Sequence, residues 1–209
     1  MKIIKVAVIL FVGFSFACKK KGCTDETATN YSEEAEKDDG TCTYSEETTF
    51  TLTSEAIVDG ELLDAFKCET SVYGVENSIP LAWSNVPDGT GSLAIIMEHF
   101  PNPDDLTMGN SYLLLWNIDP SVTEIPYATA DDGPWYMGSN KDGTNISYTS
   151  PCSPDPVTHA YSIKLYALNE TPASLPTENS LTVDWSTMND AISSVTVVGT
   201  AVLDFNDVN

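Results

Sequence analysis

From Phe50 onward the chain repeats one pattern, a short run of β-branched, aromatic or aliphatic residues followed by a turn-forming stretch. The turn-forming stretches VPDGTG, FPNPDD, ADDGPW and NKDGTN are rich in Pro, Gly, Asn and Asp. Strands and turns in alternation predict a mainly β fold, an antiparallel β-sandwich. The runs expected as strands are FTLTS, SLAIIME, SYLLLWNI, AYSIKLYAL and SVTVVGTAVLDF.

The sandwich is expected to carry one or two short helices near the C-terminus. Thr182 is a suitable N-cap residue, and Trp185, Met188 and Ile192 after it fall on one face of a helix. We expect these three side chains to be core contacts and not part of a cofactor site.

The charge of the chain excludes one class of partner. The sequence has 31 acidic and nine basic residues, a formal net charge of −22, and every basic residue is a lysine. Nucleic acid is therefore excluded, because its recognition requires a basic surface. Without arginine the chain also lacks the usual bidentate clamp for phosphate and carboxylate. An anionic ligand would have to contact histidine, backbone amides or a metal.

The N-terminus resembles a bacterial export signal. Lys2 and Lys5 precede an apolar run, residues 6–16, that is too short to span a bilayer comfortably. The sequence SFAC, residues 15–18, at the end of this run is similar to a lipobox. It predicts a signal peptide over residues 1–17 and a lipid on Cys18, and hence a lipid-anchored protein of the bacterial cell envelope. The alternative is ordinary secretion, with Cys18 in the discarded peptide.

The remaining cysteines fit an oxidising compartment. Cys23, Cys42, Cys68 and Cys152 are even in number, which allows two disulfides in three pairings. We favour Cys23 with Cys42 and Cys68 with Cys152, because the first two bracket a short polar segment. The spacing does not suit a structural zinc site.

Residues 18–48 form an acidic segment too poor in aliphatic residues to build a core. Its stretch GCTDETATNYSEEAEKDDGTC resembles a cysteine-bracketed motif of bacterial surface proteins, to which we attach no activity. Calcium binding by Asp25, Asp38 and Asp39 is one interpretation. We favour a solvated spacer ahead of a domain over residues 49–209.

Four stretches of this domain carry a resemblance to a known family: FTLTS, PLAWSNVPDGT, YLLLWNI and PCSPDPVTHAYSIKLYAL. In order and spacing they are similar to the bacterial branch of the phosphatidylethanolamine-binding proteins, also called Raf kinase inhibitor-like proteins. The resemblance covers residues 50–204. It implies a β-sandwich whose small cavity accepts phosphate-like or other small anions, and a binding protein without catalysis.

The resemblance also implies the site residues. Tyr112 stands where the family has a cavity histidine, and His159 and Tyr161 match its last element, although Ala160 replaces an arginine. His99 stands where the family has its key aspartate. The loop from residue 148 to 156 is expected to form one wall of the cavity, with the two histidines at its mouth. The implied ligand-binding residues are His99, Tyr112, His159, Tyr161 and the amides near Pro151 and Cys152.

The leading interpretation is therefore a non-catalytic, exported protein that binds a small anion or a phospholipid head group, with no cofactor. One alternative is a hydrolase, either with a serine nucleophile or with a metal held by the two histidines and Glu98 or Asp104. Against it, no HExxH or GxSxG motif occurs, and Glu98 and His99 should point to opposite faces of one strand. A second alternative is an interaction protein with a vestigial cavity.

Overall fold

The computed structural model describes residues 19–44, 48–68, 76–153 and 157–208. They fall into two compact units that divide between Glu47 and Thr48. The predicted signal peptide and its lipidation site, Cys18, lie outside the described residues. In the described part of the chain, no helix is long and apolar enough to cross a membrane.

The N-terminal unit is held by the predicted Cys23–Cys42 disulfide and by two short parallel strands, β1 (Lys21–Gly22) and β2 (Lys37–Asp38). Its aspartates serve its own turns. The Oδ1 of Asp25 accepts from the backbone N–H and the hydroxyl of Thr27, and these hydrogen bonds lower the pKa of that carboxyl. These contacts stabilise the turns of this unit, and its role as a spacer stays a prediction.

The second unit is built on a seven-stranded sheet with the strand order β10-β8-β7-β11-β12-β5-β4. Neighbouring strands are antiparallel except β12 and β5, which pair in parallel at Asn206 and Glu61. The strands are β4 (Ile57–Val58), β5 (Glu61–Leu62), β7 (Ser92–His99), β8 (Asn110–Ile118), β10 (Tyr136–Met137), β11 (Thr158–Leu168) and β12 (Val197–Val208).

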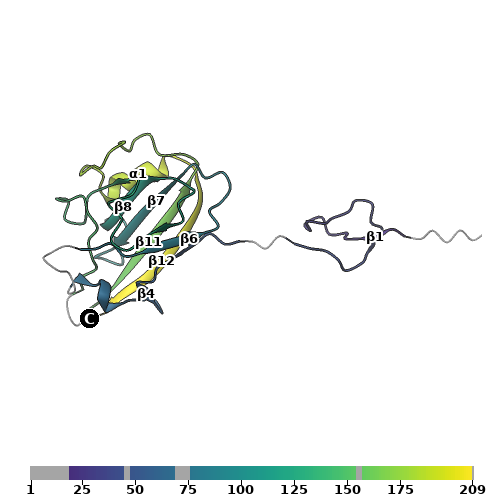
Figure 1. The fold of residues 1–209 in the computed structure, drawn as a ribbon, viewed down its shortest axis with the longest axis horizontal. Coiled ribbons are helices and arrows are strands. Elements are labelled where there is room, and N and C mark those ends of the chain that lie inside the picture. Colours follow the sequence, from purple (N-terminus) through teal and green to yellow (C-terminus); the bar gives the residue numbers. More distant parts are fainter. Residues whose placement is uncertain (1–18, 45–47, 69–75, 154–156, 209) are drawn as a thin grey trace, which may run out of the picture. The chain divides into compact units, whose positions relative to one another are not determined.

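A three-stranded antiparallel sheet, β3-β6-β9, packs against one face of the large sheet. Its strands are β3 (Thr51–Thr53), β6 (Leu81–Ser84) and β9 (Glu124–Ile125). The other face carries helix α1 (Trp185–Ser193), which lies over β7 and β8 in Figure 1. All five stretches predicted as strands contain one, and the β-sandwich is confirmed.

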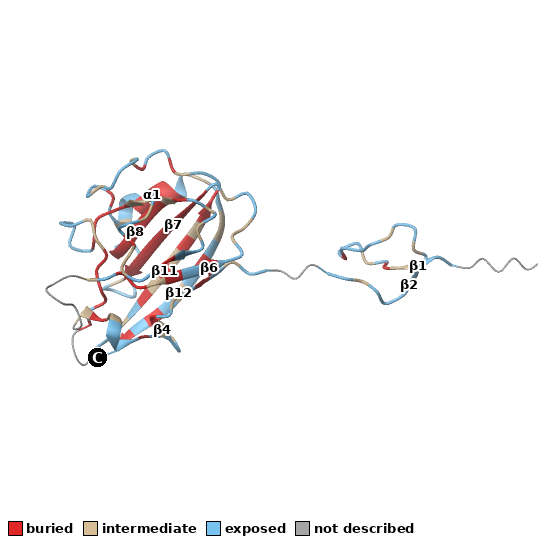
Figure 2. Ribbon diagram, viewed as in Figure 1, coloured by how far each residue is buried: buried red, intermediate tan, exposed pale blue. Residues whose placement is uncertain are grey.

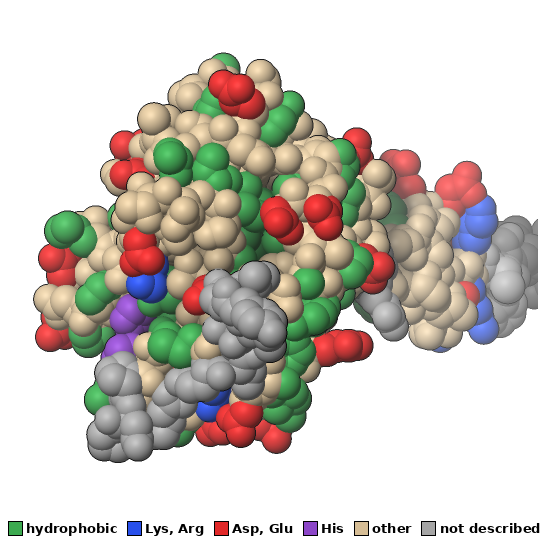
Figure 3. All heavy atoms as spheres, turned by 60° about the vertical axis from the view of Figure 1, so that its left-hand side comes forward, with side chains coloured by type: hydrophobic (Ala, Val, Ile, Leu, Met, Phe, Trp, Pro, Cys, Tyr) green, Lys and Arg blue, Asp and Glu red, His purple; other side chains and the backbone are tan. Residues whose placement is uncertain are grey.

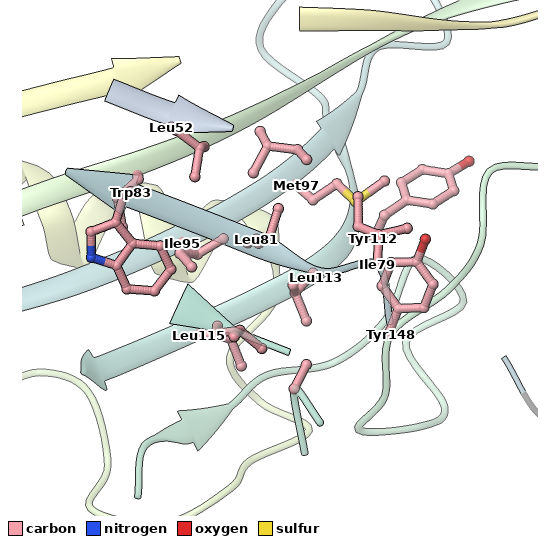
Figure 4. Packing of buried hydrophobic residues seen from close by; sticks show 14 of the residues in the cluster. Leu52, Ile79, Leu81, Trp83, Ile95, Met97, Tyr112, Leu113, Leu115 and Tyr148 are labelled. Atoms are coloured by element: carbon pink, nitrogen blue, oxygen red, sulfur yellow. The ribbon is translucent and has the colours of Figure 1, made fainter. Parts of the chain in front are cut away.

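The main core fills the space between the two sheets. Leu52, Leu81 and Trp83 of the small sheet meet residues of the large one, as Figure 4 shows. Their partners from β7 and β8 include Ile95, Met97, Leu113 and Leu115.

A second core lies between the large sheet and α1, where Ile96, Leu114 and Trp116 pack on Met188 and Ile192. Strand β7 is thus buried on both faces (Figure 2), which explains its unbroken apolar run. The expected core role of Met188 and Ile192 is confirmed, and Trp185 packs against the same cluster.

The predicted helix cap is wrong. Asp184, not Thr182, occupies the N-cap, and its carboxylate accepts a hydrogen bond from the backbone N–H of Thr187 at 2.8 Å. Thr182 instead takes part in the preceding turn, where its N–H donates to the hydroxyl of Ser180. The structure also has a short 3₁₀ helix, η1 (Asp64–Phe66), which the sequence pattern did not indicate.

Candidate ligand site

The two histidines meet where β7 ends and β11 begins. His99 is the last residue of β7 and pairs with Tyr161 of β11, two residues after His159. The imidazoles of His99 and His159 stack, with ring centroids 4.8 Å apart and an interplanar angle of 14°. The two purple side chains lie together in Figure 3. The structure thus brings together two residues that are 60 positions apart in the sequence.

Two tyrosines complete the cluster, and we call His99, Tyr112, His159 and Tyr161 the histidine–tyrosine cluster. The ring of Tyr161 lies 5.0 Å from those of both His99 and Tyr112, and Tyr112 lies 6.5 Å from His99. Phe205 of β12 also stacks on Tyr161, with ring centroids 5.3 Å apart. Strand alternation places His99, His159, Tyr161 and Phe205 on the face of the large sheet that also carries the main core. Tyr112 reaches the same face because the pairing of β7 with β8 shifts register between Met97 and Glu98.

Hydrogen bonding fixes which atoms of the cluster can act on a ligand. Nδ1 of His99 lies 2.9 Å from the backbone oxygen of Ala160, and because a carbonyl only accepts, Nδ1 carries the hydrogen. Nε2 of His99 then accepts in the neutral ring and donates in the charged one. Burial raises the pKa values of Tyr112 and Tyr161, so both keep a neutral hydroxyl that can donate.

The loop predicted as a cavity wall is attached to the domain by the second predicted disulfide, Cys68–Cys152. The backbone N–H of Cys68 also donates to the oxygen of Pro151, at 3.2 Å. Tyr148, at the start of this loop, belongs to the main core together with Tyr112 and Tyr161. Residues 154–156 of the predicted wall lie outside the described residues.

Sequence reasoning missed a buried carboxylate at this site. Asp207 of β12 is the register partner of His159 and is fully buried. Its Oδ2 accepts from the backbone N–H of Ser153 at 2.8 Å, and its Oδ1 lies 3.8 Å from Nζ of Lys67. The negative charge of Asp207 contributes to the raised pKa of Tyr161. Alternation from the inward-facing Phe205 was the signal that could have placed Asp207 on this face.

Glu98 points away from the cluster, as predicted from alternation. Its carboxylate contacts Nε1 of Trp185 and Nζ of Lys164, each at 2.5 Å. The metal-site alternative with Glu98 as third ligand is therefore not assembled. Among the described residues, no group of three His, Cys, Asp or Glu side chains is arranged to hold a metal ion.

Comparison with known proteins decides the family. The family model for phosphatidylethanolamine-binding protein matches residues 53–201. The chain belongs to the phosphatidylethanolamine-binding protein family. A UPF0098 protein of Methanothermobacter thermautotrophicus is 32% identical over 114 residues, 53% of this chain and 70% of its own. A UPF0098 protein of Chlamydia muridarum is 30% identical over 133 residues, 63% of this chain and 82% of its own.

Solved structures show the same family fold. A crystal structure of a phosphatidylethanolamine-binding protein homologue from Chlamydia trachomatis superposes with a TM-score of 0.62 and 26% identity, over 77% of this chain and 98% of that one. The E. coli protein YbcL, described as a member of the mammalian phosphatidylethanolamine-binding protein family, has a TM-score of 0.63 at 22% identity. The match covers 78% of this chain and 99% of YbcL.

Within this family fold, the cluster departs from the pattern that the resemblance implies. Position 99 supplies an imidazole in place of a carboxylate, and position 160 supplies Ala in place of an arginine. The buried Asp207 provides a carboxylate from a different strand, and its charge is opposed by Lys67. The chemistry of the cluster is therefore that of two imidazoles and two neutral hydroxyls.

Proposed function

We propose that this member of the family binds a small phosphate-bearing anion, free or as a phospholipid head group, at the histidine–tyrosine cluster. The stacked pair of imidazoles is the observation that carries the proposal. Positive charge on both rings at 4.8 Å would be repulsive, and an anion bound beside the stacked pair would offset that repulsion. The hydroxyls of Tyr112 and Tyr161 add neutral donors.

We assign no catalytic role to this cluster. Catalysis by a nucleophile or a metal requires a base with a positioned partner or a third ligand. Glu98, the nearest candidate in sequence, is engaged by Lys164 and Trp185 on the other face of the sheet. The cluster is suited instead to holding an anion reversibly.

The binding test uses dimethyl phosphate, a diester whose single charge stays constant around neutral pH. Imidazole changes charge between about pH 5 and 8. If a protonated imidazole holds the anion, the affinity measured by calorimetry should fall at least tenfold as the pH rises from about 5.5 to about 8.5. His159→Ala should remove most of the binding at the lower pH. Affinity that is independent of pH, or unchanged in His159→Ala, would contradict the proposal.

A second arm of the same experiment separates the two sources of phosphate. Inorganic phosphate and dimethyl phosphate present the same anion chemistry, but only the diester resembles a lipid head group. Preference for the diester at equal pH would favour a head group, and preference for inorganic phosphate would favour a free anion.

We further propose that the protein is exported and held in the cell envelope by a lipid on Cys18. The two disulfides support an oxidising compartment. In bacteria that express the chain, we expect Cys18→Ser to move it from the membrane fraction to the soluble fraction. Cys23→Ser is the matched control, because it replaces another cysteine, five residues away, whose sulfur is in the Cys23–Cys42 disulfide, and it should leave the protein in the membrane fraction. Equal partitioning of wild type and Cys18→Ser would refute the anchor.

A further inference from the structure

Strand β12 leaves part of one side without a partner strand. It pairs with β11 along its whole length, but on the other side it pairs with β5 only where Asn206 meets Glu61. The hairpin of β4 and β5 pairs no further along β12. The segment before this pair, residues 200–204, therefore forms a free margin of the large sheet (Figure 1), and we call it the β12 edge.

One hydrogen bond shows which backbone groups face the β12 edge. The N–H of Asn206 points away from β11, because it donates to the oxygen of Gly60 at 2.8 Å. Backbone groups of alternate residues in a strand point the same way, so the N–H and C=O of Thr200, Val202 and Asp204 also face this edge. In the described part of the chain, none of these groups has a partner in a strand ladder or a loop contact. The edge thus presents donors and acceptors at the spacing of a β-ladder.

The β12 edge lacks the protection that the two outermost strands of the large sheet have. Strand β4 has only two residues, and β10 is covered, because Met137 donates to the side chain of Asn179 and accepts from the N–H of Ser180. Natural proteins protect longer edges with proline, lysine, bulges or a covering segment. Residues 200–204 read TAVLD and pair with β11 in unbroken register. Strand β3 lies near β12 but pairs with β6 instead.

The side chains of the β12 edge suit an added strand. Thr200 and Val202 are β-branched, which favours strand pairing, and both are exposed. Val202 alone has 49% of its surface exposed. Side chains directly opposite each other in neighbouring strands contact, so a partner strand would cover this apolar surface. The same step would give the free backbone groups their hydrogen bonds.

The charges at the β12 edge distinguish a second copy of this chain from a different partner. Asp204 is exposed within the edge, and the exposed Asp59 and Glu61 belong to the hairpin beside it. Lys164 lies on the neighbouring strand β11, but its ammonium is already 2.5 Å from the carboxylate of Glu98. A second copy would bring the same carboxylates and another net charge of −22 to the contact. A segment with basic side chains would instead be attracted.

We propose that the β12 edge is a protein-interaction site that takes an extended, basic segment of a partner as an additional strand. Backbone hydrogen bonds would provide affinity, and the carboxylates beside the edge would select for positive charge. This interaction does not depend on the anion binding proposed for the histidine–tyrosine cluster.

Amide hydrogen exchange of the purified protein tests whether the edge is free. The N–H groups of Thr200, Val202 and Asp204 should exchange at least tenfold faster than those of Ala201 and Leu203, which point towards β11. Equal protection of Val202 and Leu203 in the free protein would overturn the proposal.

Three eight-residue peptides test the partner. The first alternates lysine and threonine with valine, the second has glutamate in place of each lysine, and the third has proline in place of each threonine. The first should bind saturably at about 0.15 M salt and slow the exchange of the Val202 N–H. The other two should bind at least tenfold more weakly. Equal binding of the glutamate peptide would contradict selection by charge, and equal binding of the proline peptide would contradict strand addition.

Two substitutions at one position test the backbone contact. Val202→Pro removes a donor from the edge but leaves the ladder with β11 complete, and proline is tolerated at such edge positions. It should weaken binding of the lysine peptide at least tenfold. Val202→Thr keeps the N–H and the branched side chain, so it should change the affinity less than twofold. A folded Val202→Pro protein that binds like the wild type would refute the site.

A second pair of variants separates the edge from general attraction to an acidic protein. Asp204→Asn should weaken binding of the lysine peptide about threefold, the loss expected for one exposed charge contact. Asp190→Asn removes the same charge from α1, which lies over β7 and β8, and should have a smaller effect. Equal losses would show that binding follows net charge alone and would contradict the proposal.

Sedimentation of the wild type tests the other occupant. We expect a monomer at the concentration used in the peptide titration, because two copies repel each other. A dimer that Val202→Pro abolishes would assign the β12 edge to a second copy and would overturn the proposal of a basic partner.

Discussion

Replacing both Cys68 and Cys152 with alanine should lower the free energy of unfolding of the second unit by roughly 4.5 kcal/mol, the chain-entropy value for a loop closed across 84 positions. The disulfide connects Cys68, two residues after the end of η1, to the loop beside the histidine–tyrosine cluster. Without it, the unfolded chain gains the conformational freedom that the crosslink had removed. Denaturant titration of the wild type and the double variant measures the difference.

The matched control is the double replacement of Cys23 and Cys42. These residues close a loop of 19 positions within the N-terminal unit. That replacement should leave the main unfolding transition of the second unit at the same denaturant concentration, because the two units divide between Glu47 and Thr48. If replacing Cys68 and Cys152 lowered the free energy of unfolding by less than about 1 kcal/mol, the disulfide would not be what stabilises the loop that contains Cys152.

The double replacement of Cys68 and Cys152 also tests the ligand site. Pro151 and Ser153 flank Cys152, and their backbone contacts lead to Cys68 and to Asp207. If the disulfide holds this loop against the cluster, the variant should bind dimethyl phosphate more weakly at a temperature where it is still folded. Unchanged affinity would show that the loop contributes nothing to the ligand.

The sequence predicted the strands because each of them buries a recognisable pattern. The run LAIIM is apolar at every position, and in the structure β7 is buried on both faces. The disulfides could be predicted from the polar segment that Cys23 and Cys42 bracket. The meeting of His99 with His159 was inferred through the resemblance, since no local pattern relates residues so far apart.

The errors and omissions have physical reasons. Both Thr182 and Asp184 are good cap residues, and the choice between them depends on where Val183 enters the second core, which local propensity does not contain. Asp207 is buried because Lys67, 140 positions earlier in the chain, reaches it. A carboxylate near a chain end is expected to be exposed, and only the tertiary fold reverses that expectation.

The partners of Glu98 were likewise invisible in the sequence. Alternation correctly placed Glu98 on the face opposite His99, but it could not say what lies there. Lys164 reaches Glu98 diagonally, because β7 and β11 pair Glu98 with Ser162 and Ile96 with Lys164. Trp185 reaches it from α1. Strand register and helix position together create this contact, and neither is a local property.

This network leads to the second large prediction. Glu98 is almost fully buried, with 1% of its side chain exposed, whereas one third of the Lys164 side chain is exposed. Lys164→Met should therefore lower the free energy of unfolding by about 3 kcal/mol, because it leaves a buried carboxylate without its counter-charge. Glu98→Gln should cost less, about 1 kcal/mol, since the freed ammonium can reach water and the amide oxygen can still accept from Trp185.

The double variant Glu98→Gln with Lys164→Met tests the coupling directly. This variant removes both charges and keeps an oxygen that accepts from the indole of Trp185. Its free energy of unfolding should therefore lie within about 1 kcal/mol of that of the single variant Glu98→Gln. Denaturant titration of the two single variants and the double variant completes the cycle. Additive losses, or a larger loss for Glu98→Gln than for Lys164→Met, would mean that the ion pair is not what stabilises this face.

The pH dependence of this pair follows from its geometry. Burial alone would lower the pKa of Lys164, but the hydrogen bond and charge of Glu98 outweigh burial and raise it above the ordinary value of 10.5. A raised pKa in the folded state stabilises the protein below the ordinary value, and this stabilisation is lost as the pH rises through the folded one. The ion pair of Lys164 with Glu98 therefore stays intact around neutral pH and stabilises the end of β7, where His99 is the last residue.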